Sequence, residues 1–84
     1  MSGWVFTGRA RRDFQRLDPP VRRRIIDALD RLTGEAPAGD VVKLTGAAEE
    51  WRLRVGDWRV RFQRDSSGVV EVLRVLPRGR AYRD

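Results

Sequence analysis

The 84-residue sequence predicts one α+β domain, residues 1–84, in the order β-α-α-β-β-β. We expect two N-terminal helices packed on one face of a small antiparallel sheet. Three observations lead to this prediction. Apolar residues recur at helical spacing in the first part of the chain, two alternating apolar and basic runs flank a Gly-Asp pair, and a last apolar run follows an Asp-Ser-Ser-Gly turn.

The chain begins with a short strand and a helix. The segment Gly3–Thr7 alternates weakly and predicts a strand. The segment that follows, 8–17, predicts a helix for which Thr7 is a suitable N-cap. Its apolar residues lie at helical spacing: Ala10, Phe14 and Leu17.

A second helix is predicted directly after the first. Asp18-Pro19-Pro20 ends one helix and starts the next, because aspartate is a good N-cap and proline suits the first helical turn. A Gly/Pro-containing loop, Thr33–Asp40, ends the second helix. The apolar stripe that we expect to face the core is Val21, Ile25, Leu29 and Leu32.

The stretch Glu50–Phe62, EWRLRVGDWRVRF, predicts a β-hairpin. Gly56-Asp57 lies between two alternating runs, and glycine in the first turn position suits a two-residue type II′ turn. This turn sets the register, which places apolar residues on one face and arginines on the other. The expected apolar face is Trp51, Leu53, Val55, Trp58, Val60 and Phe62, and the expected basic face is Arg52, Arg54, Arg59 and Arg61.

Two further strands complete the predicted sheet. Val41–Gly46 is a candidate short strand, and Val69–Pro77 is a longer one that follows the turn Asp65–Gly68. In the last strand Arg74 and Arg78 share their parity with two valines. Alternation therefore leaves open which face of the sheet these two arginines occupy.

Composition excludes several classes of site. The chain has no cysteine and no histidine, which excludes disulfides, thiolate zinc sites and histidine-dependent triads. Carboxylates alone remain as metal ligands, and because they form no tight cluster in the sequence we expect no metal and no cofactor. No signal peptide and no apolar run long enough to span a membrane is present, so we expect a cytoplasmic protein without a membrane partner.

The chain has a formal net charge of +6, which favours a polyanion or an acidic protein as partner. Like charges opposite each other on adjacent strands, Arg52 with Arg61 and Arg54 with Arg59, cost up to about 1 kcal/mol per pair. The basic face is either a solvated surface on which arginine is tolerated or a binding face for phosphates or carboxylates. The C-terminal run LPRGRAYRD is either a frayed basic tail or a segment that binds single-stranded nucleic acid.

The motifs KLTG, EWRLRVGDWRVRF and VVEVLRVLPRGRAYRD resemble the RelE/ParE toxin superfamily, and more closely its RelE-like branch of mRNA interferases in type II toxin–antitoxin systems. The resemblance covers nearly the whole chain. It implies a toxin that enters the A site of the 70S ribosome and cuts mRNA, which inhibits translation. Such an endoribonuclease needs neither metal nor cofactor, because the ribose 2′-OH attacks the adjacent phosphate. A RelB-like cognate antitoxin is the implied partner.

The resemblance also implies site residues. Arginines at Arg59 and Arg78 would neutralise charge that builds on the phosphorane, and Tyr82 would stack on or orient a base. Family members often have lysine at Arg52 or Arg54 and histidine at Pro77, so the general base is not assigned. The expected catalytic set is Arg54, Arg59, Arg78 and Tyr82, and the expected RNA-binding set is Arg52, Arg61, Arg80, Arg83 and Lys43.

Two other functions fit the same sequence. One is a ParE-like inhibitor that binds DNA gyrase and performs no chemistry. The other is a degenerate, basic RNA-binding domain. Retention of Arg59, Arg78 and Tyr82 favours the nuclease, because a gyrase-binding scaffold does not need these side chains together.

Overall fold

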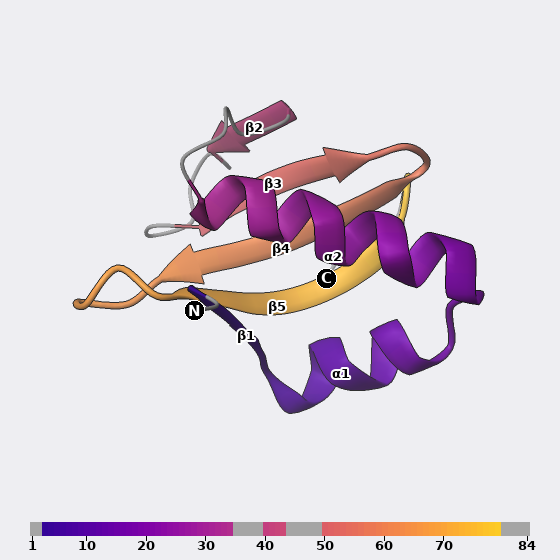
Figure 1. Cartoon of the computed structure of the whole chain (residues 1–84), viewed down its shortest axis with the longest axis horizontal. Coiled ribbons are helices and arrows are strands. Elements are labelled where there is room, and N and C mark those ends of the chain that lie inside the picture. The colour runs from indigo at the N-terminus through magenta and orange to yellow at the C-terminus, as the bar shows by residue number, and fades with distance from the viewer. Residues whose placement is uncertain (1–2, 35–39, 44–49, 80–84) are drawn as a thin grey trace.

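A computed structural model describes residues 3–34, 40–43 and 50–79. It confirms the predicted α+β class and the predicted start with a strand and two helices, but four strands follow the helices in the described ranges, one more than in the predicted β-α-α-β-β-β order (Figure 1). No helix in these ranges is long and apolar enough to cross a membrane. The elements are β1 (Trp4–Phe6), α1 (Gly8–Gln15), α2 (Pro19–Thr33), β2 (Asp40–Lys43), β3 (Glu50–Val55), β4 (Trp58–Arg64) and β5 (Val70–Pro77).

The strands form one mixed sheet in the order β1-β5-β4-β3-β2. Strands β2 to β5 pair antiparallel, as predicted, whereas β1 pairs with β5 in parallel from Trp4 opposite Val70 to Phe6 opposite Val72. The expectation of a wholly antiparallel sheet was therefore wrong for β1. Short turns impose antiparallel pairing only on consecutive strands, and β1 is separated from β5 by two helices and three strands.

The helix starts follow from their capping residues. Thr7 caps α1 as predicted, since its Oγ1 accepts a hydrogen bond of 3.2 Å from the amide of Ala10. Asp18 occupies the N-cap of α2, but its side chain makes no capping hydrogen bond. Pro20 has no amide hydrogen to donate, which removes one of the two usual partners of a capping side chain.

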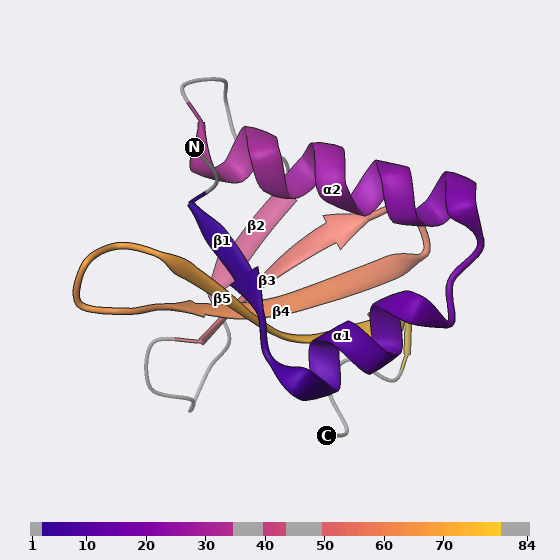
Figure 2. The same cartoon turned by 60° about the horizontal axis from the view of Figure 1, so that its bottom comes forward.

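The core lies between the sheet and the helices. Helix α2 crosses one face of the sheet, whereas α1 lies beside β5, beyond the end of β1 (Figures 1 and 2). Ile25 and Leu29 of the predicted stripe are completely buried against the sheet, and Val21 and Leu32 pack at its margin. The buried core residues are Ala10, Leu17, Ile25, Leu29, Leu53, Val60, Phe62, Val70, Val72 and Val75.

The β3–β4 hairpin has the predicted register at every position, from Val55 opposite Trp58 to Trp51 opposite Phe62. Gly56 has φ of +58°, as the predicted turn requires. The apolar face packs on the core, where Leu53, Val60 and Phe62 are completely buried.

A β-bulge in β5 settles the open question about its arginines. Arg61 pairs with Arg74, but Phe62 pairs with Val72, so Leu73 is an extra residue between them. The bulge reverses the alternation: Val72 faces the core, and Arg74 shares the face of Arg61. Simple alternation could not show this reversal.

Gly56→Ala is expected to lower the free energy of unfolding by about 1–2 kcal/mol, because an L-residue is strained at positive φ. A Cβ at this position would meet only the Arg24 guanidinium, at 3.8 Å, so the cost arises from the backbone. Gly8→Ala is the control: Gly8 opens α1 and a Cβ there meets only Arg12, at 4.0 Å. We expect this variant to gain about 0.5 kcal/mol. Urea unfolding measures the free energy of unfolding of both variants. Equal changes in Gly56→Ala and Gly8→Ala would contradict the assignment of strain to Gly56.

Candidate functional site: a basic sheet face

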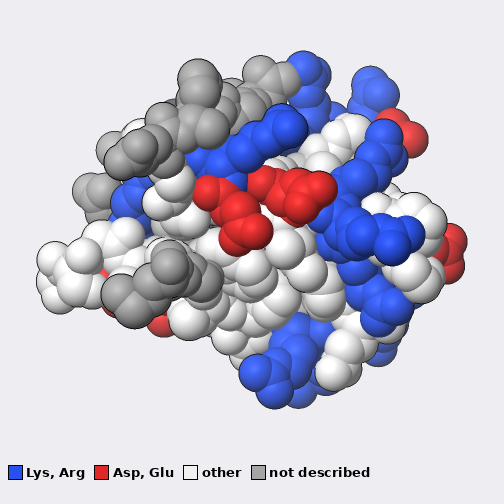
Figure 3. Space-filling model, in the orientation of Figure 1, with Lys and Arg blue, Asp and Glu red and all other residues white. Residues whose placement is uncertain are grey.

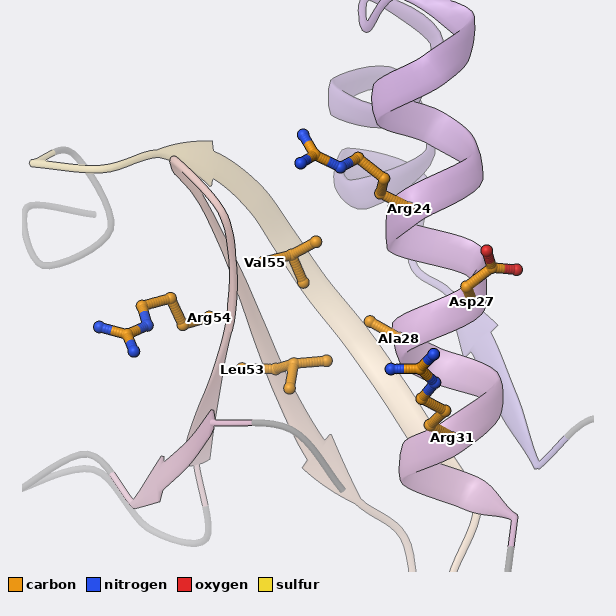
Figure 4. Close-up of a pocket in the computed structure, with 7 residues that line it drawn as sticks. All are labelled: Arg24, Asp27, Ala28, Arg31, Leu53, Arg54 and Val55. Atoms are coloured by element: carbon orange, nitrogen blue, oxygen red, sulfur yellow. The ribbon is translucent and has the colours of Figure 1, made fainter. Parts of the chain in front are cut away.

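The face of the sheet turned away from α2 carries four arginines, Arg52 and Arg54 on β3 and Arg59 and Arg61 on β4, which we call the arginine face. Figure 4 shows Leu53 and Val55 pointing toward α2, and Arg54 between them pointing the opposite way. The observed register places Arg52 opposite Arg61 and Arg54 opposite Arg59. The predicted separation of apolar and basic faces is therefore confirmed.

Arg59 is the buried member of the arginine face, with 8% of its surface exposed. Its Nη1 donates hydrogen bonds of 2.9 Å to the carbonyl oxygens of Gly56 and Trp58. The backbone of its own hairpin therefore holds the side chain in place. A guanidinium has five N–H groups, so three donors remain for a ligand after these two bonds.

The surroundings of Arg59 are strongly positive. Burial lowers the pKa of its guanidinium, and the charges of Arg52, Arg54 and Arg78 lower it further, whereas the Asp57 carboxylate acts in the opposite direction. Arginine nevertheless stays protonated in proteins. Arg59 is thus a fixed, partly desolvated cation, and an anion bound beside it would relieve the repulsion.

The chain after β5 brings Arg78 to the same region. The backbone amide of Arg78 donates a 2.8 Å hydrogen bond to the carbonyl oxygen of Asp57 in the hairpin turn. The structure therefore brings three other predicted site residues, Arg52, Arg54 and Arg78, near enough to Arg59 for their charges to act on it. Tyr82, Arg80 and Arg83 lie outside the described residues, as does the Lys43 side chain, although the Lys43 backbone pairs with Trp51.

Two carboxylates that the sequence analysis missed bind arginines on this side of the sheet. Glu50 Oε2 accepts from Arg61 Nε at 2.5 Å, and both side chains are only 14% exposed. Glu50, Arg52 and Arg54 are alternate residues of β3 and therefore point to the same face. Alternation along the strand could thus have predicted that Glu50 lies on the arginine face. Its charge offsets the repulsion that was predicted between Arg52 and Arg61.

The second carboxylate is Asp13 on α1. It accepts two hydrogen bonds from Arg74, Nε to Oδ2 at 2.8 Å and Nη2 to Oδ1 at 3.2 Å, and Oδ2 also accepts from the amide of Val75 at 3.0 Å. Burial alone would raise the Asp13 pKa, but these hydrogen bonds and the charges of Arg74 and Arg9 hold it below its ordinary value. Asp13 thus joins α1 to the part of β5 that extends past β1.

The opposite side of the sheet has a different character. A cavity of about 280 Å³ lies between α2 and β3, with Leu53, Val55 and Ala28 as its apolar surface (Figure 4). Arg24, Arg31 and Asp27 form its charged margin. Acidic side chains flanked by basic ones are visible over α2 in Figure 3. This side therefore combines an apolar surface with charges of both signs.

Carboxylates do not assemble into a metal centre in the part of the chain that is described. Within residues 3–34, 40–43 and 50–79, no three Asp or Glu side chains come together in a group that could hold a metal ion.

Comparison with solved structures identifies the fold. A chain of the RelB–RelE antitoxin–toxin complex from Methanococcus jannaschii is similar with a TM-score of 0.77 and 21% identity, over 94% of this chain and 95% of that one. A chain of the RelE–RelB complex from Pyrococcus horikoshii is similar with a TM-score of 0.73 and 28% identity, over 93% of this chain and 96% of that one. A chain of the RelBE2 complex from Mycobacterium tuberculosis is similar with a TM-score of 0.67 and 24% identity, over 89% of this chain and 95% of that one. The fold is that of RelE/ParE-type toxins.

The family assignment follows from the sequence of nearly the whole chain. Residues 5–82 match the model of the ParE toxin of type II toxin–antitoxin systems, parDE. The chain belongs to this family, within the RelE/ParE superfamily, and is the toxin of a type II toxin–antitoxin system. A search of curated proteins finds no significant match.

Proposed function

We propose that this toxin is a ribosome-dependent mRNA endonuclease, and that its arginine face together with Arg78 binds and cleaves the RNA. The observation that carries the proposal is Arg59, a largely buried guanidinium held by two backbone carbonyls, with three donors left and three further arginines around it. Fixed donors aimed at developing negative charge are usually the largest contribution to catalysis. A phosphorane formed during RNA cleavage carries such charge.

In the proposed reaction the ribose 2′-OH attacks the adjacent phosphorus, and the bond from phosphorus to the 5′ oxygen breaks. The products are a 2′,3′-cyclic phosphate and a 5′-OH, so the proton lost from the 2′-OH is balanced by the proton gained by the leaving oxygen. Arg59 and Arg78 stabilise the phosphorane, and Arg52 and Arg54 bind the RNA backbone. Because arginine is a poor base, the protein contributes electrostatic stabilisation and positioning, and the proton acceptor lies outside this arginine set.

The family match supports a second candidate, inhibition of DNA gyrase without chemistry, because the matching model is that of ParE toxins. Under this function the arginines would bind an acidic protein surface. Burial and backbone anchoring of Arg59 favour the nuclease, since a contact surface gains little from a desolvated cation at its centre.

Cleavage of mRNA on programmed ribosomes tests the proposal directly. We expect new 3′ ends that carry a cyclic phosphate, only when ribosomes are present. Pulse-labelling after induction separates the two candidates: early loss of methionine incorporation supports the nuclease, and early loss of thymidine incorporation with a DNA-damage response supports gyrase inhibition. Intact mRNA on ribosomes, together with the second labelling pattern, would refute the nuclease.

We propose further that the partner is a RelB-like antitoxin with an acidic, amphipathic segment. The similar solved structures are complexes of a toxin with its antitoxin. The cavity between α2 and β3 offers an apolar surface to an apolar side chain, and Arg24 and Arg31 at its margin suit flanking carboxylates. The cavity lies on the helix side of the sheet, and Arg54 is the one member of the arginine face that also lines it.

A further inference from the structure

A second cavity, of about 410 Å³, lies where α1 meets β5, and its charged lining is basic. Three of its six lining residues are arginines from three different elements: Arg9 of α1, Arg61 of β4 and Arg74 of β5. Thr7, Gly8 and Leu73 complete it. The cavity exists because of the β5 bulge, which turns Arg74 toward the side of Arg61 and leaves Leu73 as the extra residue.

The arginines of this cavity are held in place to different degrees. Arg61 is bound by Glu50 and Arg74 by Asp13, and the side chains in both pairs are 13–14% exposed. Their positions are therefore set by the fold. Arg9 is exposed on α1, close enough to Asp13 for its charge to lower the pKa of that carboxyl. The carboxylates of Glu50 and Asp13 offset the charges of Arg61 and Arg74. The net positive charge of the cavity is therefore that of Arg9.

The cavity continues the arginine face. Arg59 and Arg61 point to the same side of β4 two residues apart, which is about 7 Å along a strand. Arg74 is directly opposite Arg61 on the neighbouring strand, about 5 Å further. The backbone positions of Arg59, Arg61 and Arg74 thus follow one path across the sheet, and this path ends at the cavity that Arg9 also lines.

We propose that this cavity is a second nucleotide subsite, which binds a neighbouring nucleotide of the same single-stranded RNA. Arg9 contacts the phosphate, and Leu73 offers an apolar contact to the base or sugar. The inference rests on the proposed function, since it takes the arginine face as the place where the RNA is cut. It adds Arg9, which the sequence analysis did not select, to the RNA-binding residues.

RNA binding by Arg9→Ala, compared with Arg11→Ala, tests the subsite. Both arginines are exposed on α1, but only Arg9 lines the cavity. The probes are uncleavable 2′-O-methyl RNAs of about three and about eight nucleotides, because a longer strand reaches both ends of the face. For the longer RNA we expect Arg9→Ala to weaken binding about tenfold and to reduce the slope of log K against log salt by about one. Arg9→Lys should restore most of the binding, and Arg11→Ala should change neither quantity.

The outcomes separate this inference from the proposed function. If Arg9→Ala and Arg11→Ala weaken binding equally, or affect both RNA lengths equally, the subsite is wrong, whether or not ribosomal cleavage is found. If the length-dependent loss occurs only in Arg9→Ala while no mRNA is cut on ribosomes, the subsite stands and the nuclease fails. If Arg9→Ala impairs only antitoxin binding, the cavity belongs to the antitoxin and the subsite is overturned.

Discussion

Arg59→Ala is expected to abolish toxicity and to slow mRNA cleavage on programmed ribosomes by about 100- to 1,000-fold, the usual cost of losing one fixed donor to a charged transition state. Arg59 is held by the carbonyls of Gly56 and Trp58, so no neighbouring arginine takes its place without rebuilding the turn. Growth after induction and cleavage rates in vitro measure the effect.

Two variants make the Arg59 prediction specific. Arg64→Ala removes an arginine from the same strand, but on the helix side, where its guanidinium lies over the rings of Trp51 and Phe62. We expect this variant to remain toxic. Arg59→Lys keeps a positive charge without the planar fork of donors, so it should retain only part of the activity. If Arg59→Ala stays as toxic as Arg64→Ala, the proposed role of Arg59 is wrong.

Asp13→Ala is expected to lower the free energy of unfolding by about 3 kcal/mol at neutral pH, the second large effect. It removes three hydrogen bonds between α1 and β5 and leaves the largely buried Arg74 without its carboxylate. Urea unfolding measures the loss. Arg74→Met in the Asp13→Ala background should recover part of it, because the double variant no longer buries the Arg74 charge away from its Asp13 carboxylate. A double variant less stable than Asp13→Ala would contradict this account.

The same carboxylate predicts how stability depends on pH. The folded-state pKa of Asp13 lies below its ordinary value of 3.8, so its contribution is complete above pH 3.8 and is lost as the pH falls through the folded pKa. Below pH 3.8 the stability of Asp13→Asn should therefore fall less steeply than that of the wild type. The Asp65 carboxylate accepts hydrogen bonds from Ser67 and Val69, which also lower its pKa. Asp65→Asn therefore provides the comparison for a carboxylate that is exposed to solvent. Parallel curves for wild type and Asp13→Asn below pH 3.8 would contradict the role of Asp13.

The β3–β4 hairpin shows how much local sequence can decide. A two-residue turn at Gly56-Asp57 and strict alternation on both sides leave one register, and the structure has that register at all six pairs. The separation into a core face and an arginine face follows directly. The two helices were predictable for a similar reason, because their apolar spacing, the Thr7 cap and the Pro19-Pro20 start are all contained within a few residues.

The position of β1, the β5 bulge and the pairing of Asp13 with Arg74 were decided only by the tertiary structure. Parallel pairing of β1 with β5 and the Asp13–Arg74 ion pair join residues more than 60 positions apart, and no local pattern encodes which distant group will be near. The sequence by itself therefore determined that this protein has an arginine face. The packing of α1 against β5 and the return of the chain to the hairpin turn determined which arginines are buried, which are neutralised and which surround Arg59, because these properties depend on contacts between distant parts of the chain.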